Sequence, residues 1–200
     1  MSRLQLAGHI AGAGFASGDR LVVGAWDRSP IGPFVDVMWA ETTGERVLFA
    51  PTAEAADFVT AVYGFDRVEV VDLRVHASLD GVSAVAPGWT LELVAAAHGW
   101  RIPVRRPAWF TRGVEGPIAR ALMGVRTYGV SPTGVQEWYR ADAWRRIVSG
   151  RLLVDGEDRG DLAPVDPPCG FGFSEPPRTP TITAVRPLLA DPEGRLARFG

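Results

Sequence analysis

The sequence predicts an α+β fold that is mainly antiparallel β, with a sheet that closes or nearly closes into a barrel or cone and two short helices. Runs rich in β-branched and aromatic residues recur along the chain, turn signals separate them, and only two segments favour a helix. With 200 residues, 46% of them hydrophobic, the chain can bury a full core. We expect one domain over residues 1–190 and a loosely held tail over residues 191–200.

The N-terminal third of the chain predicts strands and turns. Residues 3–15 alternate loosely, and residues 19–26 form a short apolar run. Residues 34–41 then lead through the turn signal TTGE into residues 46–51, which is typical of a β-hairpin. The glycines of GAGFAS precede another strand-like run instead of a helix, so they lack the context of a dinucleotide-binding loop.

The next segment predicts a helix followed by strands. Apolar residues at helical spacing, with Thr52 as a candidate N-cap, predict a helix over residues 52–62. Alternation over residues 67–79 predicts strand structure with one core face. The other face carries Asp72, Arg74, His76 and Ser78. That face is either solvated or the polar wall of a cavity, and on the second interpretation Arg74 and His76 are candidate ligand-binding residues.

The second half of the chain predicts one more helix and further strands. Pro117 falls in the first turn of a short helix over residues 114–123. Residues 134–141, 145–156 and 181–189 are typical of β-strands. The Pro-rich residues 162–180 are too aromatic for a free linker, so we expect them to pack on the domain.

Charge and composition exclude several classes of partner. A formal charge of -2 and an isoelectric point near 5.9 argue against nucleic acid and anionic lipid. The chain contains no apolar run near 18 residues and no signal-peptide pattern, so we expect no membrane association and a cytoplasmic location. Its single cysteine and three scattered histidines match no metal motif. We expect neither a metal nor a cofactor.

All 21 basic residues are arginines. Because the chain has no lysine, no side chain of this protein can form a Schiff base with a carbonyl compound.

The run SPIGPFVDVMW, residues 29–39, places Asp36 inside a strand that otherwise looks half-buried. Either Asp36 caps a turn or pairs with a surface arginine, or it faces a cavity as a functional acid. The sequence pattern alone leaves both interpretations open.

This run and the segment that follows resemble the acetoacetate decarboxylase-like superfamily. Members commonly present a glycine, an aromatic residue and an acid at this entrance, as Gly32, Phe34 and Asp36 do here. The later run YGFDR, residues 63–67, corresponds to a WGFPK-like signature, and residues 124–147 resemble the strand pair that closes the cone in related proteins. The resemblance implies a cone whose lumen holds Asp36 opposite the Arg67 region.

The departures from the family pattern determine the chemistry. The lysine that forms the imine in the decarboxylases is replaced by Arg67, and Val68 stands where a second lysine is expected. A guanidinium stays protonated and cannot act as a nucleophile. The matching acid is retained as Asp36, one methylene shorter than the family's glutamate.

Three hypotheses follow from these residues. The first is a lyase, isomerase or cyclase that acts without an imine on a keto, enol or carboxylate compound, with Asp36 moving a proton and Arg67 binding an oxyanion. Phe34, Tyr63 and Phe65, with Arg74 and His76, would then contact an anionic or carbonyl-containing ligand. The second is a non-catalytic small-molecule-binding protein, and the third is a structural homo-oligomer. An apolar pocket with Asp36 and Arg67 on its wall would favour the first two.

Overall fold

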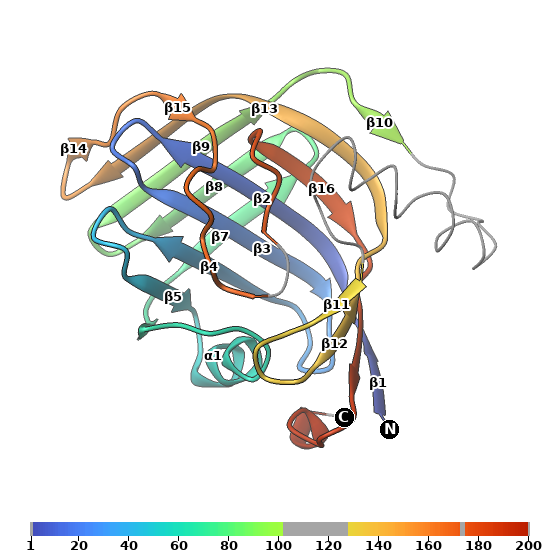
Figure 1. Ribbon diagram of the computed structural model, residues 1–200. Helices are drawn as coiled ribbons and strands as arrows, with labels where there is room; N and C mark the ends of the chain where they lie inside the picture. Colours follow the sequence, from blue (N-terminus) through green and yellow to red (C-terminus); the bar gives the residue numbers. More distant parts are fainter. Residues whose placement is uncertain (1, 102–127, 173–174, 200) are drawn as a thin grey trace.

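The computed structural model describes residues 2–101, 128–172 and 175–199, and strands make up most of them (Figure 1). The strands form one large sheet and one small sheet. Within the described residues, every strand pair is antiparallel except β5 (Arg46–Ala50) with β6 (Arg67–Val70). The prediction of a mainly antiparallel α+β fold is confirmed.

Ten strands form the continuous path of the large sheet. In spatial order they are β6, β5, β4 (Phe34–Ala40), β3 (Arg20–Arg28), β2 (Ala7–Phe15), β16 (Thr181–Val185), β13 (Ala141–Val154), β9 (Trp89–Ala95), β8 (Gly81–Ala86) and β7 (Arg74–Ser78). Three short strands extend it: β10 (Trp100–Arg101) and β14 (Glu157–Asp158) pair with β13, and β15 (Leu162–Ala163) pairs with β2.

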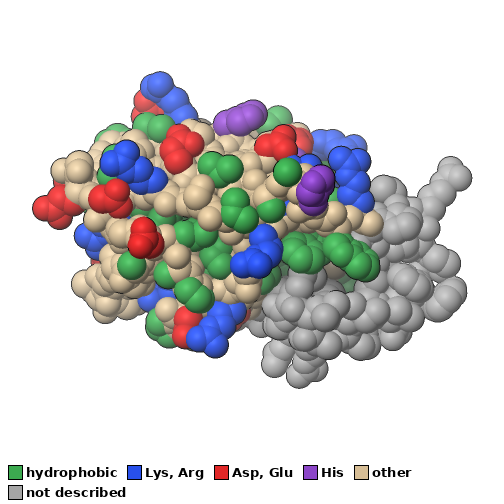
Figure 2. All heavy atoms as spheres, turned by 90° about the horizontal axis from the view of Figure 1, so that it is seen from above, with side chains coloured by type: hydrophobic (Ala, Val, Ile, Leu, Met, Phe, Trp, Pro, Cys, Tyr) green, Lys and Arg blue, Asp and Glu red, His purple; other side chains and the backbone are tan. Residues whose placement is uncertain are grey.

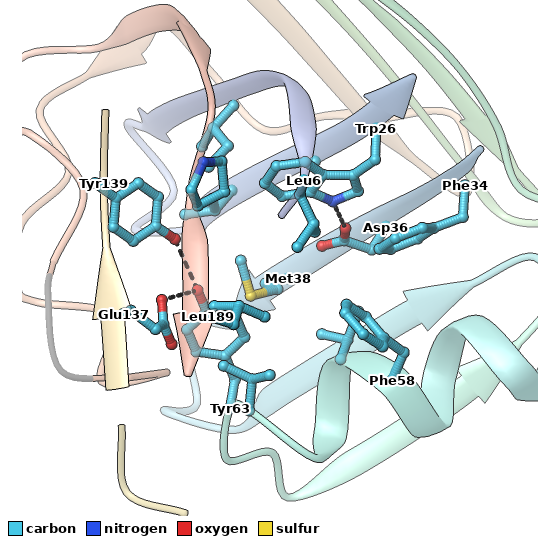
Figure 3. Close-up of a pocket in the computed structure, with 16 residues that line it drawn as sticks. Leu6, Trp26, Phe34, Asp36, Met38, Phe58, Tyr63, Glu137, Tyr139 and Leu189 are labelled. Atoms are coloured by element: carbon cyan, nitrogen blue, oxygen red, sulfur yellow. Dashed lines mark hydrogen bonds between the residues drawn. The ribbon is translucent and has the colours of Figure 1, made fainter. Parts of the chain in front are cut away.

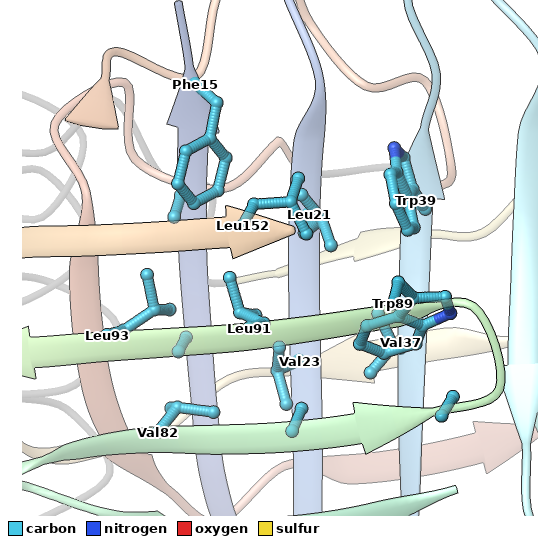
Figure 4. Close-up of a cluster of buried hydrophobic side chains, with 14 of the residues drawn as sticks. Phe15, Leu21, Val23, Val37, Trp39, Val82, Trp89, Leu91, Leu93 and Leu152 are labelled. Carbon is cyan, nitrogen blue, oxygen red and sulfur yellow. The ribbon is translucent and has the colours of Figure 1, made fainter. Parts of the chain in front are cut away.

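The large sheet curls into a half-barrel whose interior is the main hydrophobic core. Strands β8, β9 and β13 lie across β2, β3 and β4, and the side chains of the two layers meet between them (Figure 4). The residues of this hydrophobic core that Figure 4 labels are Phe15, Leu21, Val23, Val37, Trp39, Val82, Trp89, Leu91, Leu93 and Leu152. The space inside the curl is therefore packed with apolar side chains.

The long strand β13 joins the two layers. Its first half pairs with β16 and its second half with β9, and the register shifts between Ile147 and Ser149. Such a bulge bends a strand and increases its twist. Gly150 follows, and a Cβ there would lie only 2.8 Å from the Leu93 Cδ2 atom. The bulge and Gly150 together let the sheet curl back onto itself.

Helix α1 (Ala53–Thr60) and the small sheet cover the opposite, outer face of β3–β5. The Thr52 hydroxyl accepts the Ala55 backbone N–H at 3.2 Å, which confirms the helix predicted over residues 52–62 and its cap. The small sheet has the order β1 (Ser2–Gln5), β17 (Leu188–Asp191), β12 (Gln136–Trp138), β11 (Tyr128–Val130). The second predicted helix, over residues 114–123, lies outside the described residues.

The C-terminal residues pack against α1. Leu196 is fully buried, and its backbone N–H donates to the Asp191 carboxylate. The Phe199 ring, in the 3₁₀ turn η2 (Ala197–Phe199), stands 5.2 Å from the Phe58 ring in edge contact. The tail that we expected to be loosely held is instead part of a second hydrophobic cluster, which also contains Leu4, Phe58 and Leu189.

The Pro-rich segment also packs on the sheet, as expected. Val165, Cys169 and Phe171 form a third cluster with Val22 and Ala40 on the outer face. On the face shown in Figure 2, acidic and basic side chains are interspersed with hydrophobic ones. Among the described residues, no helix has the length and apolar character needed to span a bilayer.

Candidate functional site

A cavity of about 40 Å³ lies between the outer face of β2–β4 on one side and α1 and the small sheet on the other (Figure 3). It has room for about three water molecules, since one water needs roughly 10–15 Å³ by this measure. Apolar side chains, among them Leu6, Phe34, Met38, Phe58 and Leu189, form most of its wall. The polar groups on that wall are therefore few.

Asp36 is one of these polar groups, and β3 makes the room for it. Gly24 lies directly opposite Asp36 in the ladder between β3 and β4. Two residues along β3, the Trp26 indole N–H donates to the Asp36 Oδ1 atom at 2.9 Å. A Cβ on Gly24 would stand 2.3 Å from that oxygen, so only glycine leaves space for the carboxyl.

Burial controls the protonation of Asp36. The residue is only 2% exposed, and removal from water raises the pKa of its carboxyl to about 6, although the Trp26 hydrogen bond opposes the shift. Near neutral pH, Asp36 can both take up and release a proton.

A second set of polar side chains comes from β12, from the residue that follows it and from the segment that follows α1. The Tyr63 hydroxyl lies 2.9 Å from the Glu137 Oε2 atom and 2.7 Å from the Tyr139 hydroxyl oxygen (Figure 3). Glu137 is fully buried, and its Oε1 atom has no hydrogen-bond partner. We call Glu137, Tyr63 and Tyr139 the tyrosine–glutamate cluster.

Burial also shifts the titration of this cluster. It raises the pKa of Glu137 to about 7, against the effect of the hydrogen bonds from Tyr63 and Tyr139. Burial and then the Glu137 charge raise the pKa of both tyrosines, so their hydroxyls keep their protons. The Asp36 carboxylate contributes to the raised pKa of Tyr139, which places the two groups within electrostatic reach across the cavity.

The cavity therefore has two acids on facing walls and a pair of tyrosine hydroxyls beside one of them. Asp36 and the hydroxyls point toward the same space (Figure 3). Within the part of the chain that the structure describes, the cavity wall contains no arginine or histidine, and no three His, Cys, Asp or Glu side chains are grouped to hold a metal ion.

Three of the residues singled out from the sequence meet at this cavity. Asp36, Phe34 and Tyr63 line it. The cavity is not the lumen of the curled sheet, however. Asp36 lies on the face of β4 opposite to Val37 and Trp39, which belong to the packed interior.

Arg67 does not share the cavity with Asp36, and the expectation that the two side chains face each other is wrong. Its guanidinium, about 39% exposed, makes contacts of 2.8 Å with Glu41, 3.2 Å with Glu45 and 2.7 Å with Glu69. The hydrogen bond to Glu69, followed by that to Glu45, raises the pKa of Arg67. The reason is local sequence: three acids on or beside neighbouring strands surround Arg67 at the edge of the sheet.

The other candidate ligand-binding residues also lie elsewhere. Phe65 packs against Phe171, with ring centroids 5.7 Å apart. Arg74 pairs with Asp72, and both Arg74 and His76 lie on the exposed face of β7. The solvated interpretation of that strand face is therefore the correct one.

Sequence reasoning missed Trp26, Glu137 and Tyr139. A signal existed for the last two, because Val135, Glu137 and Tyr139 occupy alternate positions and so share one face of the chain. An acid between apolar residues on the inward face is the same pattern that drew attention to Asp36.

No protein-family model matches the chain, and a search of curated proteins finds no significant match. Among solved structures, the chain is similar to the crystal structure of acetoacetate decarboxylase from Legionella pneumophila subsp. pneumophila str. Philadelphia 1, with 7% sequence identity and a TM-score of 0.41. The match covers 94% of this chain and 83% of that chain.

Proposed function

We propose that the protein is an enzyme that transfers protons on a small neutral carbonyl compound in the cavity, interconverting its keto and enol forms without an imine. The observation that carries the proposal is the position of Asp36, a buried acid on the cavity wall facing the hydroxyls of Tyr63 and Tyr139. A pKa of about 6 makes Asp36 suitable as a general base near neutral pH.

The proton transfer has two coupled parts. The ionised Asp36 takes the proton from the carbon next to the carbonyl, and the electron pair of that C–H bond forms a carbon–carbon double bond. The carbonyl oxygen gains negative charge and accepts a proton or a hydrogen bond from the tyrosine–glutamate cluster. The apolar wall strengthens these electrostatic interactions because it excludes water.

The geometry favours a neutral ligand over an anionic one. Two acids line the cavity, and Arg67, which we expected to bind an oxyanion, is paired with glutamates outside it. An anionic ligand would lie near Asp36 with no cation on the described wall to compensate. We therefore narrow the expected ligand to a carbonyl compound of about three to five non-hydrogen atoms, in keeping with the small volume.

Deuterium exchange tests the proposal. Acetaldehyde is incubated with the protein in D₂O near pD 6.5, and loss of the methyl proton signal is followed by NMR. We expect the Asp36→Asn variant to lose at least about 100-fold of the exchange rate, the usual contribution of a general base. The matched control is Asp161→Asn, because Asp161 is exposed and distant in sequence.

A non-catalytic binding protein is the second candidate, and the small apolar cavity favours it. In that case acetaldehyde or acetone raises the melting temperature, whereas exchange with the wild type equals exchange with Asp36→Asn. That pair of results would overturn the enzymatic proposal. A homo-oligomer remains a prediction for either candidate.

A further inference from the structure

One carboxyl oxygen of the cavity wall lacks a hydrogen-bond donor. Glu137, on β12, is fully buried and lines the cavity. Its Oε2 atom accepts the Tyr63 hydroxyl at 2.9 Å, and Tyr139 also hydrogen-bonds this carboxyl. The Oε1 atom nevertheless has no partner among the described residues. A buried acceptor without a donor is costly for folding, so a ligand that supplies the donor would gain a hydrogen bond that the protein itself does not make.

The charge of the wall is a second observation. Asp36 lies on the facing wall, and the described lining contains these two acids but neither an arginine nor a histidine. The other titratable groups that face them are the hydroxyls of Tyr63 and Tyr139, which keep their protons because burial raises the pKa of both. The lining side chains from β2, β3, α1 and β17 are uncharged. When both acids ionise, the wall therefore holds two negative charges without a compensating cation.

Aromatic rings form part of the same wall (Figure 3). The ring centroids of Trp26 and Phe34 are 6.1 Å apart, and the Phe58 ring stands 5.6 Å from Phe34 in edge contact. The face of an aromatic ring carries negative partial charge and attracts cations. The cavity thus presents carboxyl oxygens and rings to a cation, and apolar surface to an alkyl group.

We infer that the cavity is a binding site for a small primary alkylammonium ion. Its N–H groups supply the donor that the Glu137 Oε1 atom lacks, and its charge compensates the carboxylates of Glu137 and Asp36. The cavity volume of about 40 Å³ limits the ion to about three to five non-hydrogen atoms. The inference goes beyond the proposed function, because it adds a ligand class that does not depend on proton transfer at carbon. Such an ion would compete with the carbonyl compound for the cavity.

Other ligand classes fit this wall less well. Calcium and magnesium need about six or more oxygen ligands, whereas the described lining offers two carboxyl groups and two hydroxyl groups from side chains. A quaternary ammonium ion has no N–H group to donate to the Glu137 Oε1 atom. A neutral alcohol can donate, but it leaves the two negative charges uncompensated.

Binding should depend on the ionisation of the two acids. Burial raises the pKa of Asp36 to about 6 and that of Glu137 to about 7, so both are largely neutral at pH 5 and ionised at pH 8. An alkylammonium ion stays protonated over this range, since amines of the lysine type have a pKa of about 10. A cation that enters the neutral cavity loses its hydration without gaining an opposite charge. The affinity should therefore rise from pH 5 to pH 8.

The test measures the melting temperature of the protein with ethylammonium chloride at pH 5 and pH 8. An ion of this size can reach a Kd on the order of a millimolar at best, so it is added at about 50 mM. At pH 8 we expect the wild type to melt about 3 °C or more above its value in the same concentration of sodium chloride, and at pH 5 we expect no rise. Ethanol, which is neutral and of equal size, and tetraethylammonium, which is too large, should give no rise at either pH.

Two variants locate the binding site. Glu137→Gln keeps the size of the side chain but removes its charge, so the affinity at pH 8 should fall at least about tenfold, as measured by the concentration dependence of the melting temperature. Asp36→Asn should also weaken binding, and it decides the matter if Glu137→Gln does not fold. The matched control is Glu157→Gln, an exposed glutamate on β14, which should bind like the wild type.

Three results would overturn the inference. The first is an equal rise in the wild type, Glu137→Gln and Asp36→Asn, and the second is an equal rise at pH 5 and pH 8. The third is a rise with ethanol as large as that with ethylammonium, which would assign the cavity to neutral ligands. The proposed function is tested separately by deuterium exchange of acetaldehyde, so a protein that binds ethylammonium but catalyses no exchange would refute that function and leave the ammonium site standing.

Discussion

The two faces of strands β2–β4 have opposite properties although they alternate along the same residues. On β4, Val37 and Trp39 point into the curled sheet and pack against β8, β9 and β13. Phe34, Asp36 and Met38 point the other way, where α1 and the small sheet leave a cavity. One face is a close-packed apolar core, and the other carries a buried acid on the wall of a small cavity.

The difference indicates what each face contributes. Close packing of apolar groups gives most of the stability of a domain. Buried acids such as Asp36 and Glu137 have little to gain from folding, because leaving water opposes their ionised forms. The packed interior of the curled sheet therefore provides most of the stability, whereas the outer face has room for functional polar side chains.

The largest expected difference between the two faces is the effect of shortening a buried leucine to alanine. Leu21 is 1% exposed in the packed interior, so Leu21→Ala should lower the free energy of unfolding by about 2–5 kcal/mol. Leu6 is similarly buried but borders the cavity, so Leu6→Ala should cost an amount near the lower end of that range. Urea unfolding measures both, and equal losses would contradict the distinction between the faces.

The second prediction is a fall in stability as the pH rises. The folded-state pKa values of Asp36 and Glu137, about 6 and about 7, exceed their ordinary values of 3.8 and 4.5. The native state therefore holds more protons than the unfolded state in this window. The stabilisation is full below about pH 4 and is lost as the pH rises through 6 to 7. Over this pH range, the ionisation of each acid should lower the free energy of unfolding by about 3 kcal/mol.

Unfolding measured between pH 4.5 and pH 8 checks this dependence. Asp36→Asn and Glu137→Gln should each flatten the curve, since neither new side chain ionises. Asp66 should not interfere, because the hydrogen bonds from Arg46 lower its pKa to about 2 and confine its effect to more acidic solution. A wild-type curve that rises with pH from 5 to 8 would refute the buried-acid description.

A smaller effect is expected from Gly24→Ala. The new Cβ would collide with the Asp36 Oδ1 atom and lie 2.8 Å from the Trp26 Nε1 atom, so the carboxyl must move. We expect a loss of about 1–3 kcal/mol in stability. The rate of acetaldehyde exchange should fall by a larger fraction than the free energy of unfolding does. Gly44→Ala is a matched control in which the added methyl meets no atom within 4 Å, although its φ of 89° adds backbone strain.

Much of this arrangement could be predicted from the sequence, because it depends on local patterns. Alternation and turn signals gave the antiparallel fold, and Thr52 gave the start of α1. Asp36 stood out because it is an acid within an apolar run. These features require only neighbouring residues.

The remainder depends on contacts between distant segments. Nothing near Glu137 in the sequence indicates that Tyr63, 74 residues earlier, bonds to its carboxylate. The curl of the sheet decides which face of β4 is the core, and the pattern of alternation is the same for either choice. Arg67 was placed by analogy with a lysine motif, while its actual partners were the three nearby glutamates.

The smallest expected effect is at Arg67, and it sharpens the contrast between a surface ion pair and the buried acids. Arg67→Ala should lower stability by about 0–1 kcal/mol, because Arg67 and its three glutamates are partly exposed and screened by salt. Acetaldehyde exchange should remain at the wild-type rate, since Arg67 does not line the cavity. Arg67→Lys introduces the amine that an imine needs, yet borohydride with acetoacetate should trap no adduct at this position, because residue 67 does not line the cavity. A trapped imine at position 67 would mean that this residue reaches a carbonyl-binding site after all, and the site would then have to be moved from Asp36 and Glu137 toward the edge of the sheet.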